Sequence, residues 1–93
     1  MTQITQHNDY WRLSGNVVMA SVSAILATSK SFKMDTSTTV DFADVQDIDT
    51  ATISLILEWQ RRAARENTKL NLINLPVNLV NLAQLYGVED FMH

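Results

Sequence analysis

The spacing of apolar and polar residues predicts two strands near the start of the chain. Trp11 and Leu13 alternate with polar neighbours, and this period of two is typical of a half-buried strand. The stretch from Ile4 to His7 is a candidate edge strand before it. The run Ser14-Gly15-Asn16 consists of turn residues and predicts the end of the second strand.

Apolar residues spaced three and four apart predict two longer helices. Asn16 would cap the first, which runs from Val17 to about Ser29. The second runs from Thr50 to about Glu66. Trp59 falls on a flank of this helix and is either a half-buried edge residue or a partner contact, because Trp is enriched at binding hot spots. The arginines of the same helix are interpreted as a solvated face, with an interface rim as the alternative: Arg61, Arg62 and Arg65.

The second half of the chain adds two strands and a closing helix. Thr39–Ala43 predicts a third strand, and Asp44–Asp49 is interpreted as an acidic loop after it. Lys69 to Leu75 predicts the fourth strand. Pro76 is placed as the first residue of a short helix and Gly87 as its left-handed stop.

This order of elements predicts one small α/β domain over residues 1–93 with a mixed sheet. A last apolar turn, formed by Val88, Phe91 and Met92, closes the chain. The predicted core draws on strands and helices alike: Val40, Phe42, Ile53, Ile56, Leu57, Leu72, Val80 and Ala83.

Composition narrows the classes of function. The chain has 93 residues, 46% of them hydrophobic, and no Cys, which excludes disulfides and thiolate metal sites. His7 and His93 cannot by themselves build a zinc site, and two Gly are too few for a Gly-rich phosphate loop. The formal net charge of −3 argues against nucleic acid as a main partner. We therefore expect no metal, no cofactor and no nucleic acid.

The sequence also indicates where the protein is located and whether it is an enzyme. The polar start lacks the basic and apolar segments of a secretory signal, and the longest apolar stretch, Val17–Thr28, is too short to span a bilayer. We expect a cytoplasmic protein with no membrane span. A serine nucleophile needs a base and an orienting group, and the two His residues lie near the termini, so we expect no enzymatic activity.

The acids before the long helix have a structural interpretation. The run from Asp44 to Asp49 lacks the turn Gly and distal Glu of a calcium loop. Acids at this position complement the helix dipole, and Asp49 or Thr50 would cap the helix by accepting a bond from a free backbone N–H.

Three blocks of the sequence resemble the STAS domain family of sulfate transporters and anti-sigma factor antagonists. In Val40–Thr50, reading VDFADVQDIDT, a strand ending in Asp leads to an apolar-Asp-Thr run at a helix start. Leu70–Leu75 is similar to the family's fourth strand, and Leu85–Phe91 to its apolar-Tyr-Gly-apolar-acid-acid-Phe ending. The resemblance covers nearly the whole chain from about Trp11 and implies an α/β fold, a mixed four-stranded sheet flanked by about four helices.

Two subclasses of the family fit a stand-alone domain of this length. The MlaB-type subunit docks on the cytoplasmic ATPase of an ABC phospholipid transporter, beside permease and lipid-binding subunits, and the complex maintains outer-membrane lipid asymmetry. The resemblance then implies a location peripheral to the inner membrane. The alternative is an anti-sigma factor antagonist that a kinase partner switches by phosphorylating Thr50. Many members carry Gly where this chain has Thr52, and this departure makes kinase recognition of Thr50 less certain and favours the transporter subunit.

The predicted docking surface centres on the start of the long helix. A hydroxyl there lies in the positive field of the helix and can bond a partner or carry a phosphate. A second edge is expected from the start of the closing helix, because helix starts follow the carboxyl ends of strands in α/β domains. The predicted partner-binding residues are Asp47, Asp49, Thr50, Thr52, Ser54, Leu55, Trp59, Pro76, Val77 and Asn78.

Overall fold

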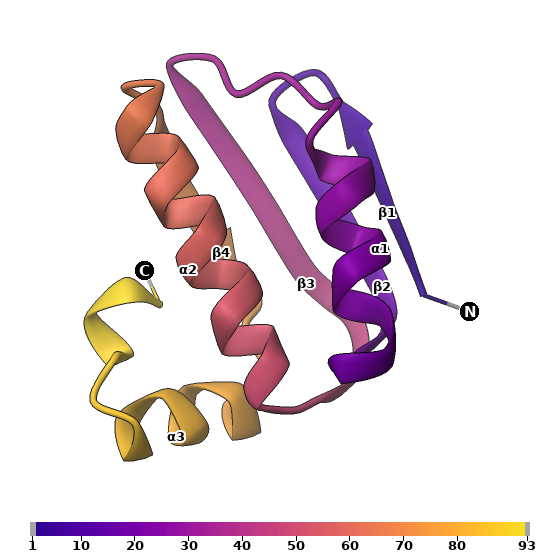
Figure 1. Cartoon of the computed structure of the whole chain (residues 1–93), viewed down its shortest axis with the longest axis vertical. Helices are drawn as coiled ribbons and strands as arrows, with labels where there is room; N and C mark the ends of the chain where they lie inside the picture. The colour runs from indigo at the N-terminus through magenta and orange to yellow at the C-terminus, as the bar shows by residue number, and fades with distance from the viewer. Residues whose placement is uncertain (1, 93) are drawn as a thin grey trace.

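Four strands and three α-helices follow one another along the chain in this computed structural model, which describes residues 2–92 (Figure 1). His93 lies outside the described residues. In chain order the elements are β1 (Gln3–His7), β2 (Tyr10–Val17), α1 (Met19–Ser29), β3 (Ser37–Ile48), α2 (Thr50–Arg65), β4 (Lys69–Ile73), α3 (Val77–Leu85) and a 3-10 turn at Glu89–Phe91. The predicted fourth helix is this short turn. Within residues 2–92, no helix combines the length and apolar character needed to cross a membrane.

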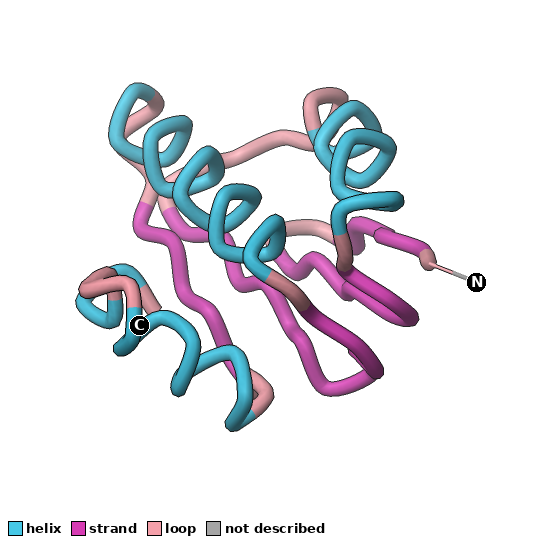
Figure 2. The backbone as a smooth tube through the Cα atoms, turned by 60° about the horizontal axis from the view of Figure 1, so that its bottom comes forward, coloured by secondary structure: helices cyan, strands magenta, loops and turns pink. Residues whose placement is uncertain are grey.

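The strands form one mixed sheet in the order β1-β2-β3-β4, which confirms the predicted architecture. β1 pairs antiparallel with β2, whereas β2 with β3 and β3 with β4 are parallel. Each parallel pair needs a crossover, and α1 and α2 supply them. Both helices lie over the same face of the sheet, while α3 lies beside it, toward the β4 edge (Figure 2).

Two strands run further than the sequence pattern predicted. β2 continues through the expected stop to Val17, because Gly15 adopts a φ of 83° at a register shift. β3 continues to Ile48, so the interpretation of Asp44–Asp49 as a loop was wrong. The parallel partner explains the extension, since Asn16 pairs with Asp47 and supplies the ladder that the polar residues lack on their own.

The helix ends confirm one expected signal and shift two others. Gly87 has a φ of 70° directly after α3, as predicted for a helix stop. Asn16 does not cap α1, because it belongs to β2; the cap residue is Val18, whose N–H donates to Ser21 Oγ at 3.0 Å. Pro76 is the cap residue of α3 and not its first helical residue.

Aromatic side chains form the centre of the core between the helices and the sheet. Trp11 packs edge-on against Phe32 and Trp59, with ring centroids 5.2 and 5.6 Å away. Six of the predicted core residues are buried, whereas Leu57 and Val80 are half-buried, and Leu57 packs against the core. The other large, fully buried side chains include Leu13, Val17, Leu55 and Leu79.

Arg62 joins the second half of α2 to the end of α1. Its Nη1 donates to the carbonyl oxygen of Ser29 at 2.7 Å and its Nη2 to that of Phe32. Its Nε lies 2.6 Å from Glu66 Oε2, and its guanidinium stacks over the Trp11 ring. The side chain is only 16% exposed. Interpreting Arg62 as part of a solvated face was therefore wrong: the guanidinium satisfies carbonyl groups where α1 ends.

Candidate protein-docking site at the start of helix α2

Asp49 holds the starts of two helices with one carboxylate. Its Oδ1 accepts the N–H of Ala51 at 2.8 Å and so caps α2, as predicted. Its Oδ2 accepts the N–H of Met19, the first residue of α1, at 3.0 Å. The half-buried carboxylate therefore fixes the start of α2 relative to α1.

Thr52 completes this junction from inside the protein. The side chain is fully buried. Its hydroxyl accepts the N–H of Asp49 at 3.1 Å and donates to the carbonyl oxygen of Val17 at the end of β2. Both hydrogen-bonding functions of the hydroxyl are used within the chain, so Thr52 positions its neighbours and is not available to a partner.

Thr50 differs from both of these neighbours because it is exposed. Within residues 2–92 its hydroxyl has no hydrogen-bond partner. It borders a hollow of about 400 Å³ whose other walls are mainly apolar: Ile53, Ser54, Leu57, Tyr86 and Val88. The open hydroxyl at the helix start thus lies against apolar surface that includes Tyr86, which is 58% exposed.

A second hollow of about 560 Å³ continues along the same side of α2. Leu57 and Val88 line both hollows, and the second adds Gln60, Arg61, Ala64 and Phe91. Gln60 Nε2 donates to the carbonyl oxygen of Phe91 at 2.9 Å, so the last turn is fixed against α2. We call the two hollows together the α2 groove. It runs between α2 and the segment that follows α3, which curves beside α2 in Figure 1.

A buried acid, Asp41, stabilises the turn that leads into α3. Asp41, 4% exposed, accepts hydrogen bonds from the Ala43 N–H at 2.9 Å, from Asn74 Nδ2 at 3.0 Å and from the Tyr10 hydroxyl. Burial by itself would raise the pKa of Asp41, but the bonds from Tyr10, Asn74 and Ala43 outweigh it and hold the pKa below its ordinary value. The hydrogen bond that the Tyr10 hydroxyl donates to Asp41 also raises the pKa of Tyr10. Asn74, with a φ of 56°, is thereby fixed just before Pro76.

Three of the predicted docking residues are in the core. Thr52, Leu55 and Trp59 are each at most 1% exposed, so none of them presents a surface to a partner. α2 packs against both the sheet and the neighbouring α1, and Trp59 Nε1 donates to Ser29 Oγ at 3.0 Å. α2 therefore buries these three residues together with the predicted Ile53 and Ile56, whereas the predicted core residue Leu57 borders the groove instead.

The other predicted residues are accessible and fall into two groups. Asp47, Thr50 and Ser54 are exposed and Asp49 is half-buried around the start of α2. Val77 and Asn78 are exposed and Pro76 is half-buried at the start of α3, and none of the three lines the α2 groove. The walls opposite Thr50 come from Tyr86 and Val88 beyond the end of α3. The sequence offered one signal for them, an aromatic residue beside the helix-stopping Gly87.

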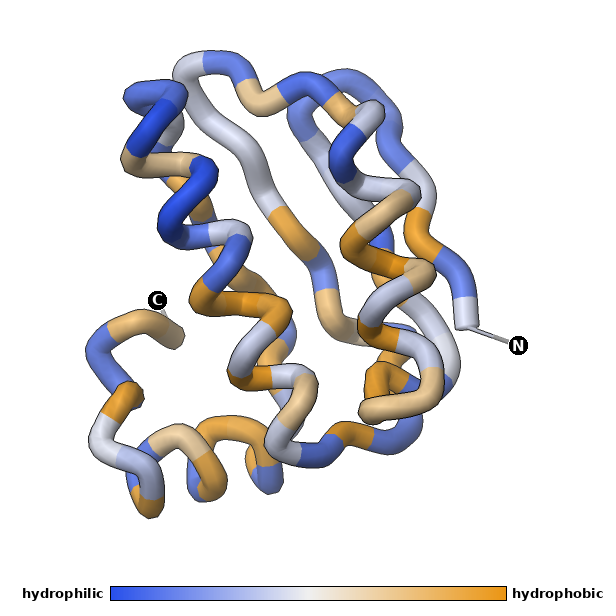
Figure 3. Tube along the Cα trace, in the orientation of Figure 1, coloured by the Kyte–Doolittle hydropathy of each residue, from blue (hydrophilic) through white to orange (hydrophobic). Residues whose placement is uncertain are grey.

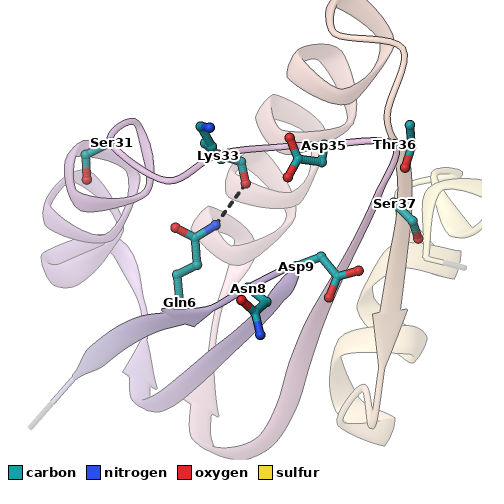
Figure 4. A pocket seen from close by; sticks show the side chains of 8 residues that line it. All are labelled: Gln6, Asn8, Asp9, Ser31, Lys33, Asp35, Thr36 and Ser37. Carbon is teal, nitrogen blue, oxygen red and sulfur yellow. Dashed lines mark hydrogen bonds between the residues drawn. The ribbon is translucent and has the colours of Figure 1, made fainter.

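A further hollow lies at the other end of β3 and is polar (Figure 4). Its volume is about 610 Å³, and it is lined by Gln6, Asn8, Asp9, Ser31, Lys33, Asp35, Thr36 and Ser37. Most of these side chains are exposed, and both signs of charge are present. No group of three His, Cys, Asp or Glu residues that could hold a metal ion occurs in the described part of the chain. The apolar character of the α2 groove makes it the stronger candidate for contact with another protein.

Comparison with known proteins agrees with this architecture. A family model described as "Mlab, STAS domain" matches residues 1–93. No curated protein matches the chain.

Solved structures share the fold at low sequence identity. The chain is similar to the anti-sigma factor antagonist SpoIIAA in its unphosphorylated form, with 19% identity and a TM-score of 0.75 over 100% of this chain and 86% of that one. It is also similar to SpoIIAA, a Bacillus cell fate determinant, in its phosphorylated form, with 18% identity and a TM-score of 0.68 over 100% and 89% of the chains. A protein named Mglu gives 18% identity and a TM-score of 0.61 over 81% of this chain and 20% of that one.

Proposed function

Because the chain belongs to the STAS domain family, whose members are protein-interaction domains, we propose that it is the non-catalytic subunit of an ABC phospholipid transporter, docked on the transporter's ATPase. In this proposal the complex also contains permease and lipid-binding subunits and maintains the lipid asymmetry of the outer membrane. The subunit is cytoplasmic and is held at the inner membrane by its partners. Family membership supports the docking role, and the MlaB description of the matching model supports the transporter.

One observation carries the proposal: Thr50 has an exposed hydroxyl that bonds to none of residues 2–92 and lies beside an apolar hollow, whereas Asp49 and Thr52 on either side are fixed. A docking surface needs apolar area for affinity and a few polar groups for register. Thr50 supplies a polar group, and the walls of the α2 groove supply the area. Asp49 and Thr52 give the helix start one defined position before the partner arrives, which lowers the entropic cost of docking.

The proposed role in transport is support of the ATPase, with ATP hydrolysis belonging to the partner. A subunit that binds the folded ATPase and not its unfolded form stabilises it by mass action. Thr50 at a helix start offers the positive end of the dipole, to which a carbonyl or carboxylate of the ATPase would bond. We therefore assign the contact to Thr50, Ser54 and the exposed Tyr86, with Asp47 at the rim.

The alternative is an anti-sigma factor antagonist that a kinase switches at Thr50. The similarity of the fold to SpoIIAA in both phosphorylated and unphosphorylated forms favours it. A phosphate on Thr50 would add a charge of about −1.5 to −2 near Asp47 and Asp49 and would oppose docking into apolar surface. Thr50 is accessible enough for either role. The MlaB description of the matching family model makes the transporter role our first proposal.

The test is co-purification with the ATPase of the proposed transporter, using Thr50→Glu. A fixed charge in the desolvated contact should reduce binding by at least about tenfold, because an unpaired buried charge costs several kcal/mol. The matched control is Thr36→Glu, an exposed threonine at the opposite end of β3. Both variants should melt like wild type, because an acid is tolerated at a helix start and Thr36 is exposed.

Three outcomes separate the possibilities. Weak binding by Thr50→Glu alone supports the docking surface, and unchanged binding rejects it. Weak binding with a much lower melting temperature would identify Thr50 as a structural residue. Incubation with a neighbouring kinase and ATP tests the alternative, which requires phosphate on Thr50 and none on a Thr50→Ala variant. Genes for a permease and a lipid-binding protein nearby favour the transporter; genes for a kinase and a sigma factor favour the switch.

A further inference from the structure

One flank of the molecule carries no charged side chain. It consists of β1 and α1, and neither residues 2–8 nor residues 13–29 contain any Asp, Glu, Lys or Arg. All the charged side chains of the described chain therefore lie outside these two segments. The exposed positions of the flank are small or neutral: Gln3, Thr5, His7, Met19, Ala20, Ser23, Ala24, Ala27 and Thr28. Figure 3 shows α1 in pale to orange colours along its length. Depletion of charge is what distinguishes the centres of protein interfaces from other surface.

β1 is also an edge strand without the usual protection. Among the described residues it pairs only with β2, so its outer side is open. Edge strands of soluble proteins are normally guarded by Lys, Pro or a bulge. β1 reads QITQH and pairs with β2 in an unbroken register, so it has none of these guards. The opposite edge of the sheet, β4, begins with Lys69.

The hairpin geometry identifies the open backbone groups. β1 and β2 are joined by the two residues Asn8 and Asp9, and His7 pairs with Tyr10. In a two-residue hairpin the pair beside the turn is hydrogen-bonded, and bonded pairs then alternate along the strands. Thr5 therefore bonds to Arg12, whereas the N–H and C=O groups of Ile4 and Gln6 point away from β2. Another β-strand placed beside β1 would form hydrogen bonds with these N–H and C=O groups at every second residue.

We propose that β1 pairs antiparallel with β1 of a second copy of this chain, with Thr5 on the two-fold axis. In this register Ile4 faces Gln6 of the other copy and Gln3 faces His7, so five residues pair with five. In this register, paired side chains of the two copies lie on the same face of the joined sheet. The two Thr5 side chains meet on the outer face, and Ile4 meets Gln6 of the other copy on the face toward α1. The outward N–H and C=O groups of Ile4 and Gln6 complete the ladder.

Charge selects a second copy over a different partner. Each chain has a formal net charge of −3, so two copies repel one another over most of their surface. The uncharged flank is where this repulsion is least. The charged side chain opposite Thr5, Arg12 on β2, is paired with Asp44 at 3.1 Å, so β1 and α1 offer no unpaired charge that would choose a complementary heterologous partner. The two α1 helices would approach over the joined strands, where Ala24 and Thr28 border a hollow of about 260 Å³ between α1 and β1.

The test measures self-association of the whole chain by sedimentation velocity from about 10 µM to 1 mM, the range of weak dimers. Wild type should shift from monomer to dimer with concentration. Thr5→Lys and Thr5→Glu should each weaken association by at least about tenfold, because like charges would meet on the axis. An equimolar mixture of the two variants should restore the dimer. The matched control, Thr36→Lys, should associate like wild type, and all variants should keep the wild-type melting temperature because both threonines are exposed.

Each result decides the proposal. A wild-type chain that stays monomeric throughout overturns it and leaves the edge to a strand of another protein. Association that persists equally in Thr5→Lys, Thr5→Glu and Ala24→Arg places the contact elsewhere and also overturns it. Loss in the single variants with rescue in the mixture supports the β1 pairing. Thr50→Glu should dimerise normally, so failure of the ATPase test and failure of this one are independent.

Discussion

The two ends of helix α2 contain similar polar chemistry and use it differently. In the second half of the helix, Arg62 donates to two carbonyl groups and Glu66, and Trp59 donates to Ser29. At the start, the side chains of Asp49 and Thr52 are also hydrogen-bonded within the chain, yet the Thr50 hydroxyl between them has no partner among the described residues. Polar groups satisfied within the chain account for stability. A polar group left open on a rigid, partly apolar surface is the one available for recognition.

Arg62→Met gives the largest effect expected from this comparison. The substitution keeps an apolar stem over Trp11 but leaves the carbonyl groups of Ser29 and Phe32 without their charged donor. We expect a loss of about 2–4 kcal/mol in the free energy of unfolding, measured by urea denaturation. Arg65→Met on the exposed face of the same helix is the control and should change it by less than about 0.5 kcal/mol. Equal losses in the two variants would remove the distinction between the helix ends.

Asp49→Ala should have an intermediate effect. It removes the cap of α2 and the acceptor for the first N–H of α1, so we expect a loss of about 1–2 kcal/mol in the same assay. Asp47→Ala, an exposed acid two residues earlier, is the control for charge alone. If both variants lost the same amount, the field of the acids and not the caps would stabilise the junction.

Asp41→Asn tests a satisfied polar group away from α2 through its pH dependence. The pKa of Asp41 is lowered by folding, so its charged form stabilises the protein above the unfolded pKa of about 4, and this contribution is lost as the pH falls through the folded value. Wild type should therefore lose melting temperature below about pH 4 more steeply than Asp41→Asn. Asp35→Asn, an exposed acid, should keep the wild-type slope. If the melting temperatures of wild type and Asp41→Asn fell equally steeply below about pH 4, the Asp41 carboxylate would not be the group that stabilises the fold.

Thr50→Ala should have the smallest effect on the fold. Its hydroxyl makes no bond to described residues, so the free energy of unfolding should change by less than about 0.5 kcal/mol. Thr52→Ala is the informative partner, because its buried hydroxyl serves Asp49 and Val17 and its loss should be clearly destabilising. Similar costs at positions 50 and 52 would mean that Thr50 has a structural bond in solution.

Much of the fold could be predicted because local patterns and packing agree. The alternation around Trp11, the long helix from Thr50 and the stop at Gly87 are all confirmed. The extension of β3 to Ile48 was not predictable from its own residues. Its polar stretch forms a strand because β2 provides a parallel partner, and that pairing is a tertiary contact.

The start of helix α2 could be predicted from the sequence, but not which of its side chains are exposed. The start of α2 and its Asp49 cap followed from the residues themselves, since caps are local. The burial of Leu55 and Trp59 depends on α1 lying beside α2, and the walls formed by Tyr86 and Val88 depend on the path of the last segment. Arg62 was misread for the same reason, because its carbonyl partners are about thirty residues away along the chain.

The two-helix cap at Asp49 restricts which side chains this position can accept. An ordinary helix cap exchanges Asp, Asn, Ser and Thr at little cost, because one acceptor oxygen is enough. Here one oxygen serves α2 and the other serves α1. Ser or Thr would satisfy one helix only, and Asn would turn its NH₂ group toward the second N–H. Residues that are interchangeable elsewhere are therefore not interchangeable here, and saturation mutagenesis should accept Asp alone at full stability.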